Sequence, residues 1–339
     1  MINHLLQTVP RRHNMPRQYP RRDFLKLSLA AGSVGLPWFG SSAPAAGKGK
    51  TVRKGAEPDN NMLTTYQIGP QIWVRWQNHV LASYRAHRSQ KYPYMFPATG
   101  PVSGLSLTTE TSLPWPHHRS MLFGCDHLNG GNFWQGDLPD GQILSDGPTL
   151  GDATDTSAVI LDQCQWKKPD HPVVCKDQRK ITVTVVDDRL RLIDWEIEWT
   201  AVQDVSIPKT NHSLFAIRAA VDLTPSGGGV LINSEGQSGE PATYGKPAAW
   251  CDFSGRRKGI PGEIVEGIAL FDHPKNPWAP CPWFTRDYGF MSPTPLYFLP
   301  NEFKLPSGNS LKLRYRVVLH AGDSKDASLA DLFKKWAAT

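Results

Sequence analysis

The sequence predicts a mostly β protein: a large antiparallel β-sandwich that ends in one helix. Three observations favour this class. Apolar and polar residues alternate along several segments, as in strands with one buried face. The chain contains 29 Gly and 29 Pro, residue types that break regular structure and form the turns between strands. Helical periodicity is clear only at the C-terminal end.

The alternating segments place apolar side chains on one face of each expected strand. In 71–86, Ile72, Val74 and Trp76 alternate with their neighbours until Gln and Asn make a turn into a second strand. In 191–202, Ile193 and every second residue up to Trp199 are apolar, while the residues between them are acidic or polar. The predicted strands lie, in chain order, in 71–86, 180–188, 191–202, 212–223 and 311–322.

The C-terminal segment 324–339 has the periodicity of a helix. Leu329, Leu332, Phe333 and Trp336 recur at spacings of three and four residues, which puts them on one face. A Ser or Asp just upstream can cap the N-terminus of this helix. The sequence therefore predicts one amphipathic helix at the end of the chain.

The N-terminal segment has the features of an export signal. Arg21 and Arg22 precede Phe-Leu-Lys, a modest apolar run follows, and Ala43-Pro44-Ala45 resembles a cleavage site. We interpret residues 1–45 as a twin-arginine signal peptide, 46–60 as a flexible linker and 61–339 as a single domain. The expected location is the periplasm or the exterior of the cell.

Charge and hydropathy exclude two classes of partner. Six of the 37 basic residues and one of the 31 acidic residues lie within 1–45, so the remainder of the chain is almost neutral. A neutral domain gives no support for nucleic-acid binding. After the leader no run of 18 apolar residues occurs, so we expect no membrane span once the signal is cleaved.

The cysteines leave one question open. All five lie after the leader, and none forms a CxxC pair. Cys164 and Cys175 flank a polar loop, and an oxidising compartment permits a disulfide there. Spacing alone does not decide whether the bond forms, because the geometry of the two strands is unknown at this level.

Two polar blocks carry most of the chemically active residues. The first covers 114–135 and the second covers 233–288, and both interleave polar residues with Gly and Pro. Such stretches make poor sheet, and loops on a rigid β scaffold are where functional sites usually lie. We therefore expect the two blocks to meet over the sandwich and to form one cleft.

The same blocks carry a family resemblance. The stretches "PHHRSMLFGCDHLNGGNFW", "NSEGQSGEP", "YGKPAAWCDFSG", "GIALFDHPKNPWAPCPWFTRDYG" and "LRYRVVLHAGD" occur in this order. Together they resemble the PmoA-like family of exported bacterial proteins, which are often labelled methane oxygenases. An oxygenase subunit of that name is a membrane helix bundle, whereas this chain has the pattern of a β protein. The resemblance and the β pattern imply a galactose-mutarotase-like supersandwich.

The leading functional interpretation is acid/base chemistry on a carbohydrate-like ligand, by epimerisation, elimination or hydrolysis. Histidine is the natural proton-transfer group near neutral pH, and a carboxylate commonly completes the pair in sugar chemistry. We expect His118 to act as base or acid with His273 opposite, and Glu240 or Asp287 to be the carboxylate. The expected substrate contacts are His117, Arg119, Asp126, Asn129, Trp134, Lys246, Trp250, Trp283 and Arg286, which supply charge, hydrogen bonds and aromatic faces.

Two other classes stay open. A carbohydrate-binding or envelope interaction protein would use the same side chains without turnover. A copper or iron protein is the third interpretation, because His117, His118, Asp126, His127 and His273 supply suitable donor atoms. Adjacent His117 and His118 would point in opposite directions on an extended chain unless the backbone turns there. We therefore assign no metal ligand and no cofactor from the sequence.

Overall fold

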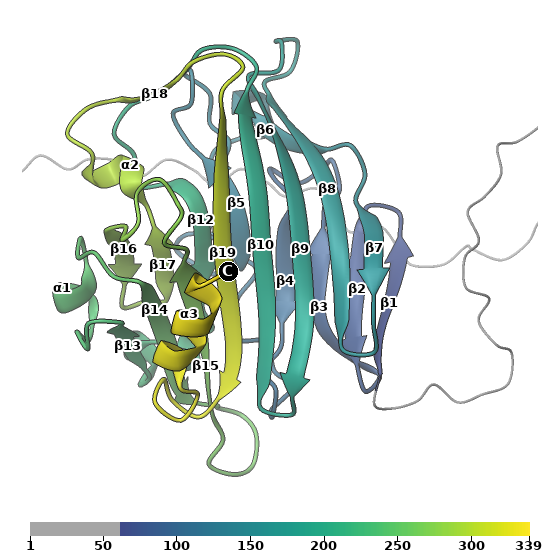
Figure 1. Ribbon diagram of the computed structural model, residues 1–339, viewed down its shortest axis with the longest axis vertical. Coiled ribbons are helices and arrows are strands. Elements are labelled where there is room, and N and C mark those ends of the chain that lie inside the picture. Colours follow the sequence, from purple (N-terminus) through teal and green to yellow (C-terminus); the bar gives the residue numbers. More distant parts are fainter. Residues whose placement is uncertain (1–61) are drawn as a thin grey trace, which may run out of the picture. The chain divides into compact units, whose positions relative to one another are not determined.

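The computed structural model describes residues 62–339, which belong to one compact unit, Glu57–Thr339. The predicted signal peptide and linker lie outside the described residues, and the domain boundary at residue 61 stays a prediction. The fold is a mostly β, antiparallel sandwich with a small C-terminal helix, which confirms the predicted class (Figure 1). All strand pairs within 62–339 are antiparallel, in two large sheets and one small one.

The first sheet has eight strands, and the second has nine. In spatial order the first consists of β1 (Leu63–Ile68), β2 (Gln71–Trp76), β3 (His79–Arg85), β4 (Tyr94–Ala98), β5 (Met121–Cys125), β12 (Ser213–Arg218), β17 (Phe290–Pro293) and β16 (Trp283–Arg286). The second consists of β13 (Val230–Asn233), β14 (Trp250–Arg256), β15 (Val265–Asp272), β19 (Ser310–Ala321), β10 (Leu190–Ala201), β9 (Cys175–Asp187), β8 (Ser157–Lys167) and β6 (Gln142–Ser145), with β7 (Thr149–Ala153) also paired to β8. The small sheet pairs β11 (Val205–Ile207) with β18 (Phe303–Leu305).

The long strands of the second sheet show why alternation predicted this fold. Along β10, Trp195 and Trp199 are fully buried, whereas Glu196 and Glu198 alternate with them on the outer face. Trp195 packs edge-on against Phe215 of β12, with 5.1 Å between ring centroids. The inward side chains of the two sheets therefore form one core between them.

The central strands of the first sheet depart from the alternating pattern. All residues of β5 and β12 are buried, although 212–223 was predicted to have one solvated face. Phe123 and Phe215 face the other sheet, where Phe123 lies 5.7 Å from Trp166. The opposite face of β5 and β12 is buried as well, because His118 and Trp134 of the first polar block pack there with Phe290 of β17. This covered outer face is where the candidate site forms.

The C-terminal helix packs on the outer face of the second sheet. Helix α3 (Leu329–Ala337) buries Leu329 and Trp336 against Phe271 and Trp250 in a second, smaller apolar cluster. The amphipathic helix is thus confirmed. Its N-cap residue, Ser328, makes no side-chain capping bond. None of the helices within 62–339 has the length and apolar character that a membrane span requires.

The register of β8 and β9 answers whether Cys164 and Cys175 form a disulfide. All five cysteines are free and buried, so Cys164 and Cys175 do not form a disulfide here. Cys164 lies opposite Asp177 in the ladder, whereas Cys175 lies opposite Trp166. Burial raises the pKa of the Cys125 and Cys251 thiols well above their ordinary value, so neither is a reactive thiolate near neutral pH.

Candidate functional site

Three histidines meet on the covered outer face of the first sheet. His117 and His118 lie in the loop before β5, and His212 directly precedes β12. Strands β5 and β12 are neighbours, with Ser213 opposite Cys125, so the starting point of β12 lies beside the end of β5. One donor atom from each imidazole lies within 4.8 Å of the others. We call these three residues the histidine cluster.

A local turn brings His117 and His118 to the same place. The backbone N–H of His118 donates to the carbonyl of Trp115 at 3.1 Å, which closes a turn around Pro116. The two rings lie edge to face, with centroids 4.4 Å apart. The extended backbone that would separate them is therefore absent at this point of the chain, and both rings reach His212, at 5.2 and 5.5 Å between centroids.

Asp126 fixes the orientation of His212. Its Oδ2 accepts a hydrogen bond from His212 Nδ1 at 3.1 Å and another from Gln135 Nε2 at 3.2 Å. Its Oδ1 accepts one from the Thr210 hydroxyl. Because a carboxylate only accepts, the Nδ1–H of His212 is the donor in this bond, which turns its Nε2 toward the cluster. That Nε2 lies 3.4 Å from His118 Nε2.

The surroundings keep the other two imidazoles neutral. Burial lowers the pKa of His118 to about 2, helped by the nearby His117, His212 and Arg218. Burial also lowers the pKa of His117 to about 4; His212 and Arg218 act in the same direction, and Asp126 opposes them. At neutral pH both rings therefore hold free lone pairs. His117 Nε2 and His118 Nδ1 are buried and have no hydrogen-bond partner.

Arg218 adds an unpaired charge beside the cluster. It ends β12 and is only 3% exposed, yet within 62–339 its side chain makes no ion pair. Its Nε and Nη1 are buried without a partner, and its guanidinium lies 4.4 Å from the centre of the Tyr288 ring. Burial lowers the Arg218 pKa. Buried cations in native proteins are normally paired, so this one calls for an explanation.

Tyr288, the last residue of the second polar block, and Phe290 of β17 reach the same place. The ring of Phe290 lies 4.2 Å from that of His118, and Tyr288 stacks beside it at 6.3 Å. The Tyr288 pKa is raised by burial, while Arg218 and Arg286 lower it. Trp115, which is 43% exposed, borders the cluster at 6.0 Å from His117. The second block therefore reaches the cluster at its C-terminal end, whereas much of it, predicted as loop, forms β14 and β15 of the second sheet and β16 of the first.

A model of one protein family matches residues 71–334. The chain belongs to DUF6807, a family of unknown function. No curated protein matches it. Among solved structures, a galactose mutarotase related enzyme from Lactobacillus acidophilus matches with 10% identity and a TM-score of 0.24, over 76% of this chain and 97% of that one.

In this DUF6807 chain two of the expected carboxylates are already occupied. Glu240 Oε1 accepts from Arg286 at 2.7 Å, and its Oε2 accepts from the backbone of Asp287 at 3.0 Å. Asp287 Oδ1 accepts from the backbone of Glu240 at 2.8 Å, at the start of the short helix α1 (Glu240–Thr243). The pair and Arg286 thus hold the second block together next to Tyr288.

The expectation that His273 faces His118 is wrong. His273 follows β15 of the second sheet, where its ring packs at 4.7 Å on Trp336 and its Nε2 lies 3.0 Å from Arg314. Trp250 also lies in the apolar cluster under α3. The core of the sandwich separates these residues from the histidine cluster, because the two groups lie on outer faces of different sheets. The order of the strands in the two sheets determines this separation, and the sequence spacing of the residues does not reveal it.

The other expected substrate contacts divide into two groups. Asp126 and Trp134 belong to the site: Trp134 is fully buried, lies 5.6 Å from His212 and has an unpartnered Nε1. Arg119 lies next to the cluster in sequence but donates to Gln90 and packs on Tyr94.

Three expected contacts lie elsewhere. Asn129 ties the loop after β5 to β11 through Asp204 and Ser206. Trp283 is a core residue that donates to the Ala248 carbonyl, and Lys246 is exposed.

Sequence reasoning missed His212, Arg218 and Tyr288 as site residues. His212 lies 94 residues after His118 and outside both polar blocks. A signal was present nevertheless, because "HSLFAIRAAV" places a histidine and an arginine in an otherwise apolar strand. A charged residue within a strand that is buried on both faces indicates a partner beyond the strand itself.

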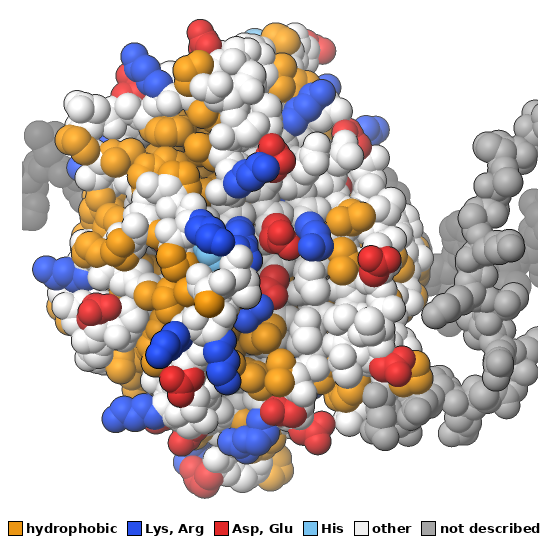
Figure 2. All heavy atoms as spheres, viewed as in Figure 1, with side chains coloured by type: hydrophobic (Ala, Val, Ile, Leu, Met, Phe, Trp, Pro, Cys, Tyr) orange, Lys and Arg blue, Asp and Glu red, His pale blue; other side chains and the backbone are white. Residues whose placement is uncertain are grey.

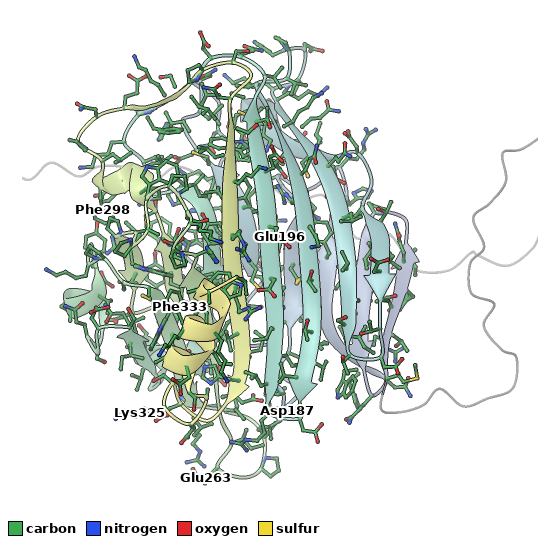
Figure 3. All side chains as sticks on the ribbon, in the orientation of Figure 1. Asp187, Glu196, Glu263, Phe298, Lys325 and Phe333 are labelled. Atoms are coloured by element: carbon green, nitrogen blue, oxygen red, sulfur yellow. The ribbon has the colours of Figure 1, made fainter. Side chains whose placement is uncertain are left out.

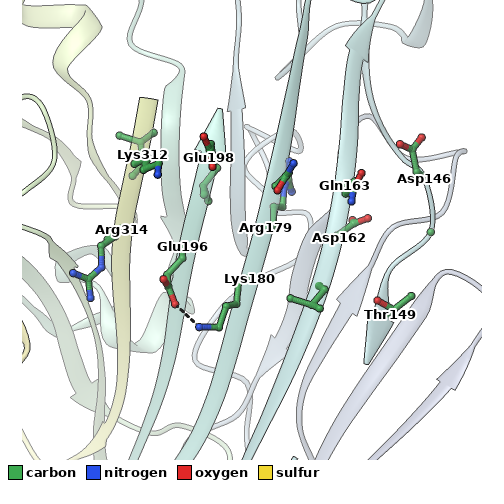
Figure 4. Close-up of a pocket in the computed structure, with 15 residues that line it drawn as sticks. Asp146, Thr149, Asp162, Gln163, Arg179, Lys180, Glu196, Glu198, Lys312 and Arg314 are labelled. Carbon is green, nitrogen blue, oxygen red and sulfur yellow. Dashed lines mark hydrogen bonds and ion pairs between the residues drawn. The ribbon is translucent and has the colours of Figure 1, made fainter. Parts of the chain in front are cut away.

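A hollow in this DUF6807 chain lies away from the histidine cluster, on the outer face of the second sheet. It has a volume of about 590 Å³ and is lined by residues of β8, β9, β10 and β19, among them Lys180, Glu196, Lys312 and Arg314 (Figure 4). Glu196 points outward from β10 (Figure 3) and pairs with Lys180 at 3.0 Å. Acidic and basic side chains are interspersed over this face (Figure 2). Charged side chains that stand in solvent and pair with one another account for this hollow, so we infer no ligand there.

Proposed function

We propose that the protein is an exported carbohydrate-active protein that binds an acidic, sugar-like ligand at the histidine cluster. The observation that carries the proposal is the buried, unpaired guanidinium of Arg218 beside three imidazoles. The twin-arginine pattern at residues 21–26 supports export, and the PmoA-like resemblance fits the same proposal.

Arg218 defines the charge of the ligand. A buried cation costs several kcal/mol unless an anion or strong hydrogen bonds compensate it. The Tyr288 ring supplies a cation–π contact of roughly 1–2 kcal/mol, which offsets only part of that cost. An anionic group of a ligand, such as the carboxylate of a uronic acid, would bind the free Nε and Nη1 donors and complete the pairing.

The aromatic residues fit a sugar ring next to that anionic group. Trp115 offers an exposed indole face at the edge of the cluster. Tyr288 contributes a phenol next to Arg218 and Arg286. Flat apolar faces with polar edges are the usual contacts for sugar rings in open sites.

The occupied carboxylates narrow the reaction class. Hydrolysis by a carboxylate pair needs two carboxyl groups facing the substrate. Here Asp126 is committed to His212, Thr210 and Gln135, and Glu240 to Arg286. Pairing of the ligand carboxylate with Arg218 would instead favour loss of the proton on the adjacent carbon. An imidazole of the histidine cluster would take that proton. Protonation of the resulting carbanion on its other face gives epimerisation, and departure of a neighbouring oxygen substituent, which takes up a proton as it leaves as an alcohol, gives elimination.

Ligand selectivity tests the proposal. We expect glucuronate or galacturonate to raise the melting temperature and to bind more tightly than glucose or galactose, as measured by thermal shift and calorimetry. In Arg218→Met the preference for the acids should disappear. Arg256→Met removes an exposed arginine, paired with Glu263 on the second sheet, and should preserve the preference.

The outcomes separate the functional classes. Equal binding of neutral and acidic sugars by the wild type would overturn the proposal. Tight binding of an acid that stays unchanged during long incubation, followed by NMR, would favour a binding protein over an enzyme.

A further inference from the structure

We propose that His117, His118 and His212 bind one divalent transition-metal ion, for which Zn²⁺ is the best match. Three imidazole donors within 4.8 Å of one another are close enough to share an ion after small side-chain rotations. Two nitrogens bound tetrahedrally to Zn²⁺ lie about 3.3 Å apart, since each Zn–N bond is about 2.0–2.1 Å. His118 Nε2 and His212 Nε2 are already 3.4 Å apart.

The shell around His212 supports the same assignment. Histidines that bind metals almost always donate their second N–H to a carboxylate or carbonyl, which fixes the tautomer and orients the ring. His212 donates in this way to Asp126, which is 1% exposed and is itself held by Thr210 and Gln135. Asp126 is therefore a positioning residue in this proposal.

A hydrogen bond between His118 and His212 is the simpler alternative. It would explain the 3.4 Å separation but would leave the Nε2 of His117 buried without a partner. A metal ion that accepts one lone pair from each residue removes that cost at His117; His118 Nδ1 has no partner in either arrangement. The His212 side chain is 15% exposed and His117 is half-buried, so solvent has a route to the cluster.

The donor set selects the type of ion. Three neutral imidazoles suit Zn²⁺, Cu²⁺, Ni²⁺ or Fe²⁺ and are poor ligands for Mg²⁺ or Ca²⁺. Three protein ligands leave a fourth position open, as in zinc sites that act on a substrate. Beside Arg218 the ion makes the site strongly positive, which suits an anionic group; this last step rests on the proposed function, whereas metal binding does not.

Metal uptake by the full chain tests the inference. Protein purified without a histidine tag and treated with a chelator should bind one Zn²⁺ per chain by calorimetry. Co²⁺ should bind with the same stoichiometry and give the intense visible absorption of tetrahedral coordination. Mg²⁺ should give no binding.

Variants locate the ion. His118→Gln and His212→Gln should each lower Zn²⁺ affinity by roughly 100-fold or more, and Asp126→Asn by about 10–100-fold with the Co²⁺ spectrum altered. His171→Gln is the matched control, because His171 is exposed and lies outside the cluster; its affinity should be unchanged. Circular dichroism of each metal-free variant shows whether it is folded. The Co²⁺ spectrum of the wild type tests metal binding even if a variant fails to fold.

Two results would overturn the inference: no uptake of Zn²⁺, Co²⁺ or Cu²⁺ by the chelated wild type at micromolar concentrations, or uptake that folded His118→Gln and His212→Gln proteins retain in full. Acidic sugar binding by the metal-free protein would then leave the proposed function standing. Metal uptake without any sugar binding would overturn the proposed function and would still support the metal site.

Discussion

The outer faces of the two sheets differ in how their polar groups are satisfied. On the middle of the second sheet, charged side chains stand in solvent and pair with each other, as Lys180 does with Glu196. Elsewhere in that sheet Asp252 and His320 form a buried pair, and each has one atom without a partner. On the first sheet, loops bury His117, His118, Trp134 and Arg218, and each has at least one polar atom without a partner. A hollow lies on the second sheet, but unsatisfied buried groups beside a buried cation are the stronger indication of a ligand. Four predictions test this contrast.

The largest effect is expected inside the second sheet. Asp177 and Arg179 point into the core from β9 as a fully buried ion pair, with Nε and Oδ1 2.6 Å apart. Asp177→Asn would leave the Arg179 charge buried and unpaired, so we expect the free energy of unfolding to fall by about 3–5 kcal/mol. Urea unfolding measures this. A loss below about 1 kcal/mol would show that an unpaired buried arginine is easily tolerated, and it would weaken the reasoning from Arg218.

The next effect depends on pH. Burial raises the pKa of Asp272, at the end of β15, to about 7, while Asn276 and the Cys281 backbone oppose the shift. Because the folded pKa exceeds the unfolded value of 3.8, the associated stability is complete below pH 4 and is lost as pH rises through 7. This difference between the folded and unfolded pKa of Asp272 corresponds to a loss of about 4 kcal/mol in the free energy of unfolding.

Asp272→Asn provides the comparison for that pH dependence. Its stability should vary much less than that of the wild type between pH 4 and 8, as followed by urea unfolding at each pH. Parallel curves for the two proteins would refute the assignment to Asp272.

A smaller effect of opposite sign is expected at Arg218. In the ligand-free, metal-free protein, Arg218→Met replaces an unpaired buried charge with an apolar side chain of similar length. We expect the free energy of unfolding to rise by about 1–2 kcal/mol, even though ligand selectivity is lost. Thermal unfolding beside Arg256→Met, which should be nearly neutral, measures the gain. Marked destabilisation would mean that Arg218 has a structural role.

The smallest effect is expected on the solvated face. Lys180 and Glu196 are each about half exposed, so Lys180→Ala should change the free energy of unfolding by less than about 1 kcal/mol. The change should shrink further at high salt. A change as large as that in Asp177→Asn would remove the distinction between the two faces of β9.

The sequence predicted the fold better than the site because strand periodicity is a local property. Alternation in 191–202 and 311–322 corresponds to β10 and β19, and the helical spacing from Leu329 to Trp336 corresponds to α3. The failure at 212–223 has a physical cause: β12 is covered on both faces, and only the folded loops supply the second cover.

The site was predicted in part. The first polar block does bring His117, His118, Asp126 and Trp134 together with His212, but the second block reaches them at its end, through Tyr288. His273 and Trp250 were misplaced because β15 and β14 belong to the other sheet. His212 was missed because it lies in neither block, and its proximity to Asp126 arises only from the pairing of β12 with β5.

The sequence by itself determined the class of this protein: it predicted several of the long strands and the position of the C-terminal amphipathic helix. These properties follow from the repeat of side-chain direction along one strand or helix, which nearest neighbours encode. The tertiary structure alone decided which histidines share a site, because strand order and the turn around Pro116 set distances between residues far apart in the chain. It also decided that Arg218 is buried without an acid, the feature from which the ligand is inferred.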